Sequence, residues 1–229
     1  MTQKYWCTTL IDLSQTVVAL DLDDTLYPEA AYRASGLREV CIWVKALYGK
    51  SVSPEIASQH ASEDADPLAE ICHAAGLPMS VKESLLWIYR LHAPDLTLTA
   101  EVSDCVNTLV VQCKAVVILT DGRSISQRQK LKALGLSHLP AYISDDHDSV
   151  KPDLLRFNLI MRDYPAQRYV YLGDNPKKDF LAPNALSWLT IGLRGDATNI
   201  HSQDVSGLPI ENLPTKWISS MKELKASLC

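Results

Sequence analysis

The sequence lacks the long apolar run that a membrane-spanning helix requires, so we do not expect the chain to cross a bilayer. Its first residues contain no long apolar stretch followed by a small-residue cleavage site, which argues against a secretory signal. The chain also shows no internal repeat and no low-complexity tract. These absences, with an ordinary share of apolar residues, predict a soluble, cytoplasmic globular protein.

Clusters of lysine and arginine are missing as well. The 22 basic residues are outnumbered by 27 acidic ones, which gives a net charge of −5. A nucleic-acid partner is therefore not expected. Because this overall charge does not attract phosphorylated molecules, any phosphate site has to be made locally positive by a metal, a lysine or helix N-termini.

The cysteines form no C-x-x-C pair and have no histidine cluster beside them. This arrangement gives little support for a zinc site. We expect reduced, partly buried thiols, the usual state of cysteine in the cytosol, at all six positions: Cys7, Cys41, Cys72, Cys105, Cys113 and Cys229.

Short apolar runs that alternate with helical patterns organise most of the chain. Helical patterns at residues 126–134 and 153–162 lie between the apolar runs. Strands that alternate with helices predict a doubly wound parallel α/β sheet with helices on both faces. The candidate strands are residues 17–20, 115–119, 141–144, 169–172 and 189–193.

Residues 28–94 interrupt this alternation, because they contain helical patterns and no convincing buried strand. The simplest interpretation is a helical subdomain inserted after the first strand. We therefore expect an α/β core made of residues 1–27 and 95–229, with a helical cap at 28–94. An amphipathic helix at 216–228 is expected to close the chain.

Polar groups follow three of the predicted strands at their carboxyl ends, where ligands bind in open parallel sheets. Clustered carboxylates without a basic partner repel one another, so a hard divalent cation such as Mg²⁺ is implied. With a lysine and a hydroxyl, Mg²⁺ can neutralise a phosphoryl group, while one carboxylate acts as nucleophile and another as acid and base. The groups are Asp21, Asp23, Asp24 and Thr25 after the first strand, Thr120, Asp121 and Gly122 after the second, Asp174 after the third, and Lys151 before a helix.

At these positions the chain resembles the haloacid dehalogenase (HAD) superfamily of hydrolases over about residues 15 to 195. Residues 21–26, Asp-Leu-Asp-Asp-Thr-Leu, match the first motif, D-x-D-x-T-L. Thr120 stands at the second motif, and Lys151 resembles the third. Residues 173–179 resemble the fourth motif, a Gly-Asp pair followed by a second aspartate. The resemblance implies a Rossmann-like core, a helical cap and a Mg²⁺ cofactor.

The resemblance also implies roles for single residues. Asp21 is the expected nucleophile and Asp23 the general acid and base. The implied metal ligands are Asp21, Asp174 and the backbone carbonyl of Asp23. Contacts to the phosphoryl group are expected from four residues: Thr120, Asp121, Gly122 and Lys151.

Three positions near this site are less clearly defined. Asp121 stands where many members have asparagine. Because an ionised carboxylate repels phosphate, we expect its side chain to turn toward backbone amides. Asp179 is expected to orient Lys151 or the metal shell. Arg123 is compatible with either a substrate contact or a surface position.

The predicted function is hydrolysis of a small phosphomonoester, such as a sugar phosphate or a nucleoside monophosphate, and the expected partner is that small phosphorylated metabolite. A phosphomutase of the same superfamily and a non-catalytic protein that binds a phosphometabolite are alternatives. A dehalogenase needs no acid two residues after the nucleophile, so Asp23 argues against that activity. The sequence predicts no oligomeric state.

Overall fold

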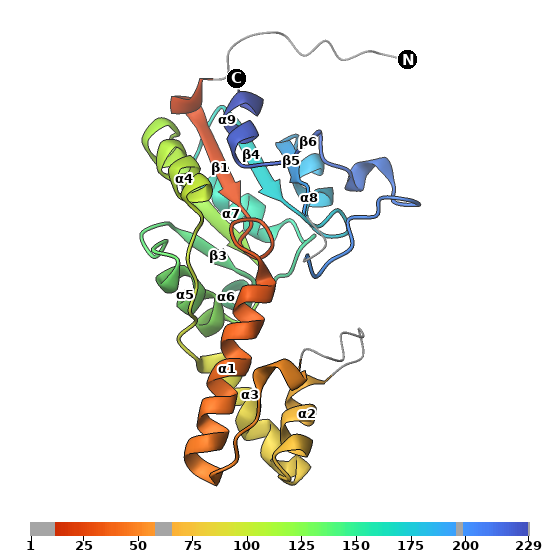
Figure 1. Ribbon diagram of the computed structural model, residues 1–229. Helices are drawn as coiled ribbons and strands as arrows, with labels where there is room; N and C mark the ends of the chain where they lie inside the picture. The colour runs from red at the N-terminus through yellow and green to blue at the C-terminus, as the bar shows by residue number, and fades with distance from the viewer. Residues whose placement is uncertain (1–11, 58–65, 196–198, 229) are drawn as a thin grey trace.

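The computed structural model describes residues 12–57, 66–195 and 199–228, and Figure 1 shows it as a ribbon. Cys7, Cys229 and the parts of the expected domains at 1–11, 58–65, 196–198 and 229 lie outside the described residues. Within the described ranges, every helix is too short or too polar to span a membrane.

A six-stranded, all-parallel sheet forms the centre of the fold, in the order β3-β2-β1-β4-β5-β6. This confirms the predicted α/β fold class. Strands β2 and β3 follow β1 on one side of the sheet, and the chain then crosses over so that β4, β5 and β6 lie on the other side. The strand order therefore reverses between β1 and β4, and ligands bind at such a reversal in open parallel sheets. The strands are β1 Thr16–Leu20, β2 Ala115–Thr120, β3 Ala141–Ile143, β4 Arg168–Gly173, β5 Leu189–Leu193 and β6 Lys216–Ile218.

Helices cover both faces of the sheet because the strands are apolar on both faces. Along β1, Val18 and Leu20 pack into one core cluster, while Val17 and Ala19 pack into the other. All four are fully buried, as expected for a central parallel strand. The first cluster lies under α4 (Ala100–Gln112), α5 (Ser124–Ala133) and α9 (Lys222–Ser227), and the second under α7 (Leu155–Asp163) and α8 (Leu181–Ala185); α6 (Ser144–His147) follows β3.

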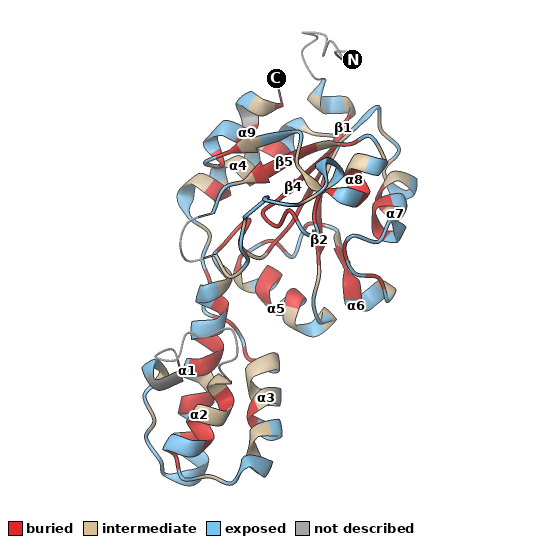
Figure 2. Ribbon diagram, turned by 90° about the vertical axis from the view of Figure 1, so that its right-hand side faces the viewer, coloured by how far each residue is buried: buried red, intermediate tan, exposed pale blue. Residues whose placement is uncertain are grey.

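A separate group of helices follows the carboxyl end of β1. In Figure 1, α1 (Glu29–Tyr48) projects away from the sheet with α2 (Pro67–Ala74) and α3 (Lys82–Leu91) beside it. These helices bury their own apolar cluster, which includes Val40 and Ile71. Figure 2 shows buried stretches, in red, along α1 and α2. This group corresponds to the predicted insertion, and its role as a cap remains a prediction.

The loop between β1 and α1 is fixed by Asp24, which has a left-handed backbone conformation with φ of 52°. Its carboxylate accepts hydrogen bonds from the backbone N–H of Glu29, at 2.7 Å, and of Ile200, at 2.9 Å. The first of these bonds satisfies an N–H at the start of α1. Asp24 therefore ties the beginning of the helical group to the core.

The expected closing helix at 216–228 is wrong in its first half. Lys216–Ile218 forms strand β6, which pairs in parallel with β5, and only Lys222–Ser227 is helical. Trp and Ile favour strands, and β5 offers an unpaired edge. The Trp217 ring also lies directly over Gly192, where an added Cβ would approach it to 2.5 Å. Tertiary pairing thus outweighed the helical periodicity.

Candidate active site

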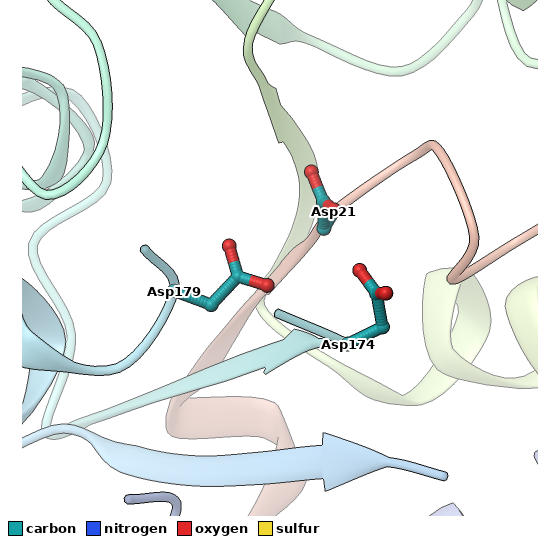
Figure 3. A group of neighbouring side chains, drawn as sticks. All are labelled: Asp21, Asp174 and Asp179. Atoms are coloured by element: carbon teal, nitrogen blue, oxygen red, sulfur yellow. The ribbon is translucent and has the colours of Figure 1, made fainter. Parts of the chain in front are cut away.

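Three buried carboxylates converge beyond the carboxyl ends of β1 and β4. Asp21 directly follows β1, Asp174 directly follows β4, and Asp179 comes from the loop before α8. Each offers an oxygen that lies within 4.8 Å of the others, and Figure 3 shows the three side chains pointing toward one another. Adjacent parallel strands place Asp21 and Asp174 side by side, because their ends meet at one edge of the sheet.

Lys151 supplies the positive charge of this cluster. Its Nζ donates to Asp21 at 2.8 Å, to Asp179 at 2.6 Å and to the Tyr171 hydroxyl at 3.1 Å. Burial lowers the pKa of this ammonium, but the carboxylates of Asp179 and Asp21 outweigh burial and hold the pKa well above its usual range. Lys151 therefore stays protonated beside Asp21.

Both carboxylate oxygens of Asp179 have protein partners. One accepts from Lys151 and from the Tyr171 hydroxyl, and the other accepts from the backbone N–H of Asn175 at 2.7 Å. Asp179 thus bonds directly to Lys151, the partner in one of the two roles expected from the sequence. Gly173 permits this arrangement, because an added Cβ would lie 2.5 Å from an Asp179 oxygen.

Asp21 and Asp174 both have carboxyl pKa values above the ordinary value for aspartate. Burial raises the pKa of Asp21 to about 7, although Lys151 opposes the increase. Burial, followed by the charge of Asp21, raises the pKa of Asp174 to about 8. No lysine or arginine in the described ranges forms an ion pair with Asp174. A hard divalent cation such as Mg²⁺ fits this oxygen set.

These shifts predict how stability depends on pH. In both aspartates the folded-state pKa lies above the ordinary value of 3.8, so the folded chain binds protons more tightly than the unfolded chain. This tighter proton binding stabilises the folded chain fully at a pH below the ordinary pKa of 3.8. The stabilisation is lost as the pH rises through the folded-state pKa values of about 7 and 8. We therefore expect the melting temperature of the metal-free protein to fall as the pH rises from mildly acidic to mildly alkaline.

Thermal melts in EDTA and in MgCl₂ across this pH range measure the effect. Mg²⁺ should raise the melting temperature most at the alkaline end, where both carboxylates are ionised and repel one another without it. Replacing both Asp21 and Asp174 with asparagine should flatten the dependence on pH. A metal-free protein whose stability rises steadily over the same range would contradict the prediction.

The turn after β2 holds the second-motif residues. The Asp121 carboxylate accepts from the backbone N–H of Lys151 at 3.2 Å and pairs with the buried guanidinium of Arg156. Arg156 also donates to the Thr120 carbonyl at 2.8 Å. The Asp121 side chain is therefore turned toward a backbone amide, as expected, and its charge is neutralised. The Gly122 N–H donates to the Ser144 hydroxyl at 2.9 Å.

Asp23 has partners that sequence reasoning did not identify. Its carboxylate pairs with Lys130 and accepts from the amide of Gln127 and the hydroxyl of Tyr27. The helix that carries Gln127 and Lys130 is strongly polar, and it also contains Arg128 and Lys132. Because nothing in its residue order distinguishes Lys130 from the exposed Lys132, only the three-dimensional structure could reveal this pair.

A cavity of about 430 Å³ opens over these groups. Its floor contains the predicted site residues, and Arg123 also lines it. Side chains from α1 and α3 line it as well: Tyr32, Leu86, Tyr89 and Arg90. The cavity therefore lies between the sheet edge and the helical group.

A scan against protein-family models and a search of curated proteins found no match to this sequence. Solved structures do resemble the chain. YfnB from Bacillus subtilis, described as a HAD-hydrolase bound to magnesium, matches with a TM-score of 0.65 at 17% identity, over 94% of this chain and 99% of its own. A 2-haloacid dehalogenase from Pseudomonas syringae matches with a TM-score of 0.61 at 20% identity, over 93% and 97%.

A predicted phosphoglycolate phosphatase from Haemophilus somnus matches with a TM-score of 0.63 at 15% identity, over 97% of this chain and 100% of its own. At these identities the likeness concerns the fold. It extends over nearly the whole chain, the helical group included, and it agrees with the fold that the sequence motifs implied.

Proposed function

We propose that this chain, which has the haloacid dehalogenase fold, is a Mg²⁺-dependent phosphatase that hydrolyses a small phosphomonoester through an aspartyl-phosphate on Asp21. The observation that carries this proposal is the buried Asp21 carboxylate, which is bonded to a protonated Lys151 and lies beside the buried carboxylate of Asp174. A nucleophile flanked by a cation and by a second carboxylate suited to a metal matches the needs of phosphoryl transfer.

The reaction would proceed in two steps. An oxygen of Asp21 attacks phosphorus, the bond from phosphorus to the ester oxygen breaks, and Asp23 donates a proton to the departing oxygen. Asp23 then takes a proton from water, which attacks the aspartyl-phosphate and releases inorganic phosphate from Asp21. Lys151 stabilises negative charge on the phosphoryl oxygens throughout, and the Thr120 hydroxyl hydrogen-bonds the same group.

The side chains of Asp21 and Asp174 and the backbone carbonyl of Asp23 would hold the metal. A bound Mg²⁺ supplies charge neutralisation for the phosphoryl oxygens and offsets the repulsion between the carboxylates. Asp179 is not assigned as a ligand, because Lys151, Tyr171 and Asn175 already occupy its oxygens.

We assign residues 28–94 the role of a cap that closes over the site and selects the substrate. The cavity of about 430 Å³ suits a small molecule such as a sugar phosphate or a nucleoside monophosphate. Phosphoryl contacts are assigned to the turn formed by Thr120, Asp121 and Gly122, together with Lys151. Since the Asp121 carboxylate is turned away, its contribution would come from its backbone.

Hydrolysis of p-nitrophenyl phosphate tests this function. We expect release of p-nitrophenol in MgCl₂ and a loss of at least about 100-fold in EDTA, because the metal neutralises charge that the protein alone does not. Restored activity after Mg²⁺ is added back is the control for damage by the chelator. Equal rates in EDTA and in MgCl₂ would contradict a metal-dependent mechanism.

The same assays separate the alternatives. A phosphomutase would transfer the phosphoryl group to a second hydroxyl of a sugar phosphate and release little inorganic phosphate. A dehalogenase would release halide from a 2-haloacid, without a requirement for Mg²⁺ and without a need for Asp23. A non-catalytic binding protein would bind a phosphorylated metabolite with no turnover of any ester.

A further inference from the structure

The carboxylate of Asp23 is held by an ammonium that sequence reasoning did not identify. Lys130, on helix α5, places its Nζ 2.7 and 2.9 Å from the two Asp23 oxygens. The Gln127 amide donates to one of these oxygens at 3.0 Å, and the Tyr27 hydroxyl donates to the other. Lys130 and Gln127 are 5% and 2% exposed, so both donors are fixed by their surroundings.

Lys130 also contacts the helical group. Its Nζ lies 4.2 Å from the centre of the Tyr32 ring, within the range of a cation–π contact. Tyr32 belongs to α1 and packs edge-on against Tyr89 of α3, with the ring centres 5.8 Å apart. The ammonium thus contacts both an aromatic ring of the helical group and the carboxylate that follows β1.

We propose that Lys130 is a positioning residue for Asp23, and that the face of the Tyr32 ring fixes the ammonium in turn. This inference rests on the proposed function, in which Asp23 protonates the departing oxygen. An acid acts only within hydrogen-bond reach of the atom that it protonates, and a displacement of 1 Å can cost about 100-fold in rate. The contact with Tyr32 makes the placement of Asp23 depend on the position of the proposed cap.

The test compares two esters that differ in their need for an acid. An alkyl phosphate such as glycerol phosphate has a poor leaving group that requires a proton, whereas p-nitrophenolate departs readily without one. The value of kcat/KM covers only the steps up to departure of the leaving group. In Lys130→Met we expect it to fall by about 100-fold for the alkyl ester and by less than about tenfold for the aryl ester.

Lys132→Met is the matched control, because Lys132 lies on the same helix and is exposed. It should leave both values within about twofold of the wild type. If Lys130 had only a structural role, its replacement would lower kcat/KM equally for both esters. An unchanged ratio of the two kcat/KM values in Lys130→Met therefore overturns the inference. Circular dichroism and thermal melts verify that each variant folds.

A double-mutant cycle tests whether Lys130 acts through Asp23. Adding Lys130→Met to an Asp23→Asn protein should cost less than about twofold in kcat/KM for the alkyl ester, because the group that Lys130 positions is already gone. A further large loss in the double variant would show an independent role and overturn the inference. Tyr32→Leu, which removes the ring, should lower the alkyl-to-aryl ratio more than Tyr32→Phe, which keeps it.

Failure of the inference can be distinguished from failure of the proposed function. Wild-type turnover of both esters, with an unchanged ratio in Lys130→Met, overturns the positioning role alone. If the wild type turns over neither ester in MgCl₂, the proposed function is overturned. The inference is then overturned as well, because Asp23 has no leaving group to protonate.

Discussion

Replacement of Asp21 with asparagine is expected to lower kcat for phosphomonoester hydrolysis by at least about 10⁴-fold, since removing a catalytic nucleophile leaves only binding and charge stabilisation. The substitution keeps the size of the side chain but replaces the attacking oxygen with a neutral amide. Lys151 and Asp179 remain to bind each other at 2.6 Å, so the variant should fold. The loss would therefore report on chemistry and not on stability.

Steady-state assays with p-nitrophenyl phosphate in MgCl₂ measure this effect, and a thermal melt checks the fold. Asp104→Asn is a suitable control, because Asp104 is exposed on α4. Mass spectrometry after rapid acid quench should find one phosphoryl group on Asp21 of the wild-type enzyme and none at this position in Asp21→Asn. Substantial activity in Asp21→Asn would remove Asp21 from the role of nucleophile.

Replacement of Lys151 with methionine should damage both stability and activity. Lys151 is the only cation within ion-pair distance of Asp21 and Asp179 among the described residues. Breaking a buried ion pair on one side leaves uncompensated charge, which costs about 3–5 kcal/mol in the free energy of unfolding. The loss of a cation beside the phosphoryl group should also lower kcat by about 100-fold or more.

Urea denaturation at neutral pH measures the stability of Lys151→Met, and assays on protein that is still folded measure its activity. Lys177→Met is the matched control, because Lys177 is exposed on the loop before Asp179. The loss of stability should be smaller at acidic pH, where Asp21 is protonated and no longer needs a cation. A variant as stable as the wild type would show that Lys151 is not needed to neutralise the buried carboxylates of Asp21 and Asp179.

The core of the fold and much of the candidate site were predictable because their signals are local. Apolar strands that end in polar residues specify a parallel sheet and the edge where ligands bind. The structure brings Asp21 and Asp174 together at that edge, with Lys151 between Asp21 and Asp179. The expected turn of the Asp121 side chain was likewise predictable, since a carboxylate facing a phosphate is repelled.

Features that depend on distant partners were not predictable in this way. Strand β6 forms because β5 offers a free edge, and no local pattern in Lys216–Ile218 reveals that edge. Arg156 resembles an ordinary helix residue, yet it is fully buried against Asp121.

The sequence by itself determined where the principal strands lie along the chain, the helical character of residues 28–94 and the carboxylates, hydroxyl and lysine of the candidate site. These follow from periodicity and from residue type at the ends of strands, which act over a few residues. Only the tertiary structure decided which charges neutralise one another. Lys130 pairs with Asp23 across 107 positions of the chain, and Arg156 pairs with Asp121 across 35. Such pairs depend on packing between elements, because an ammonium or guanidinium is buried only where the fold brings a carboxylate to meet it.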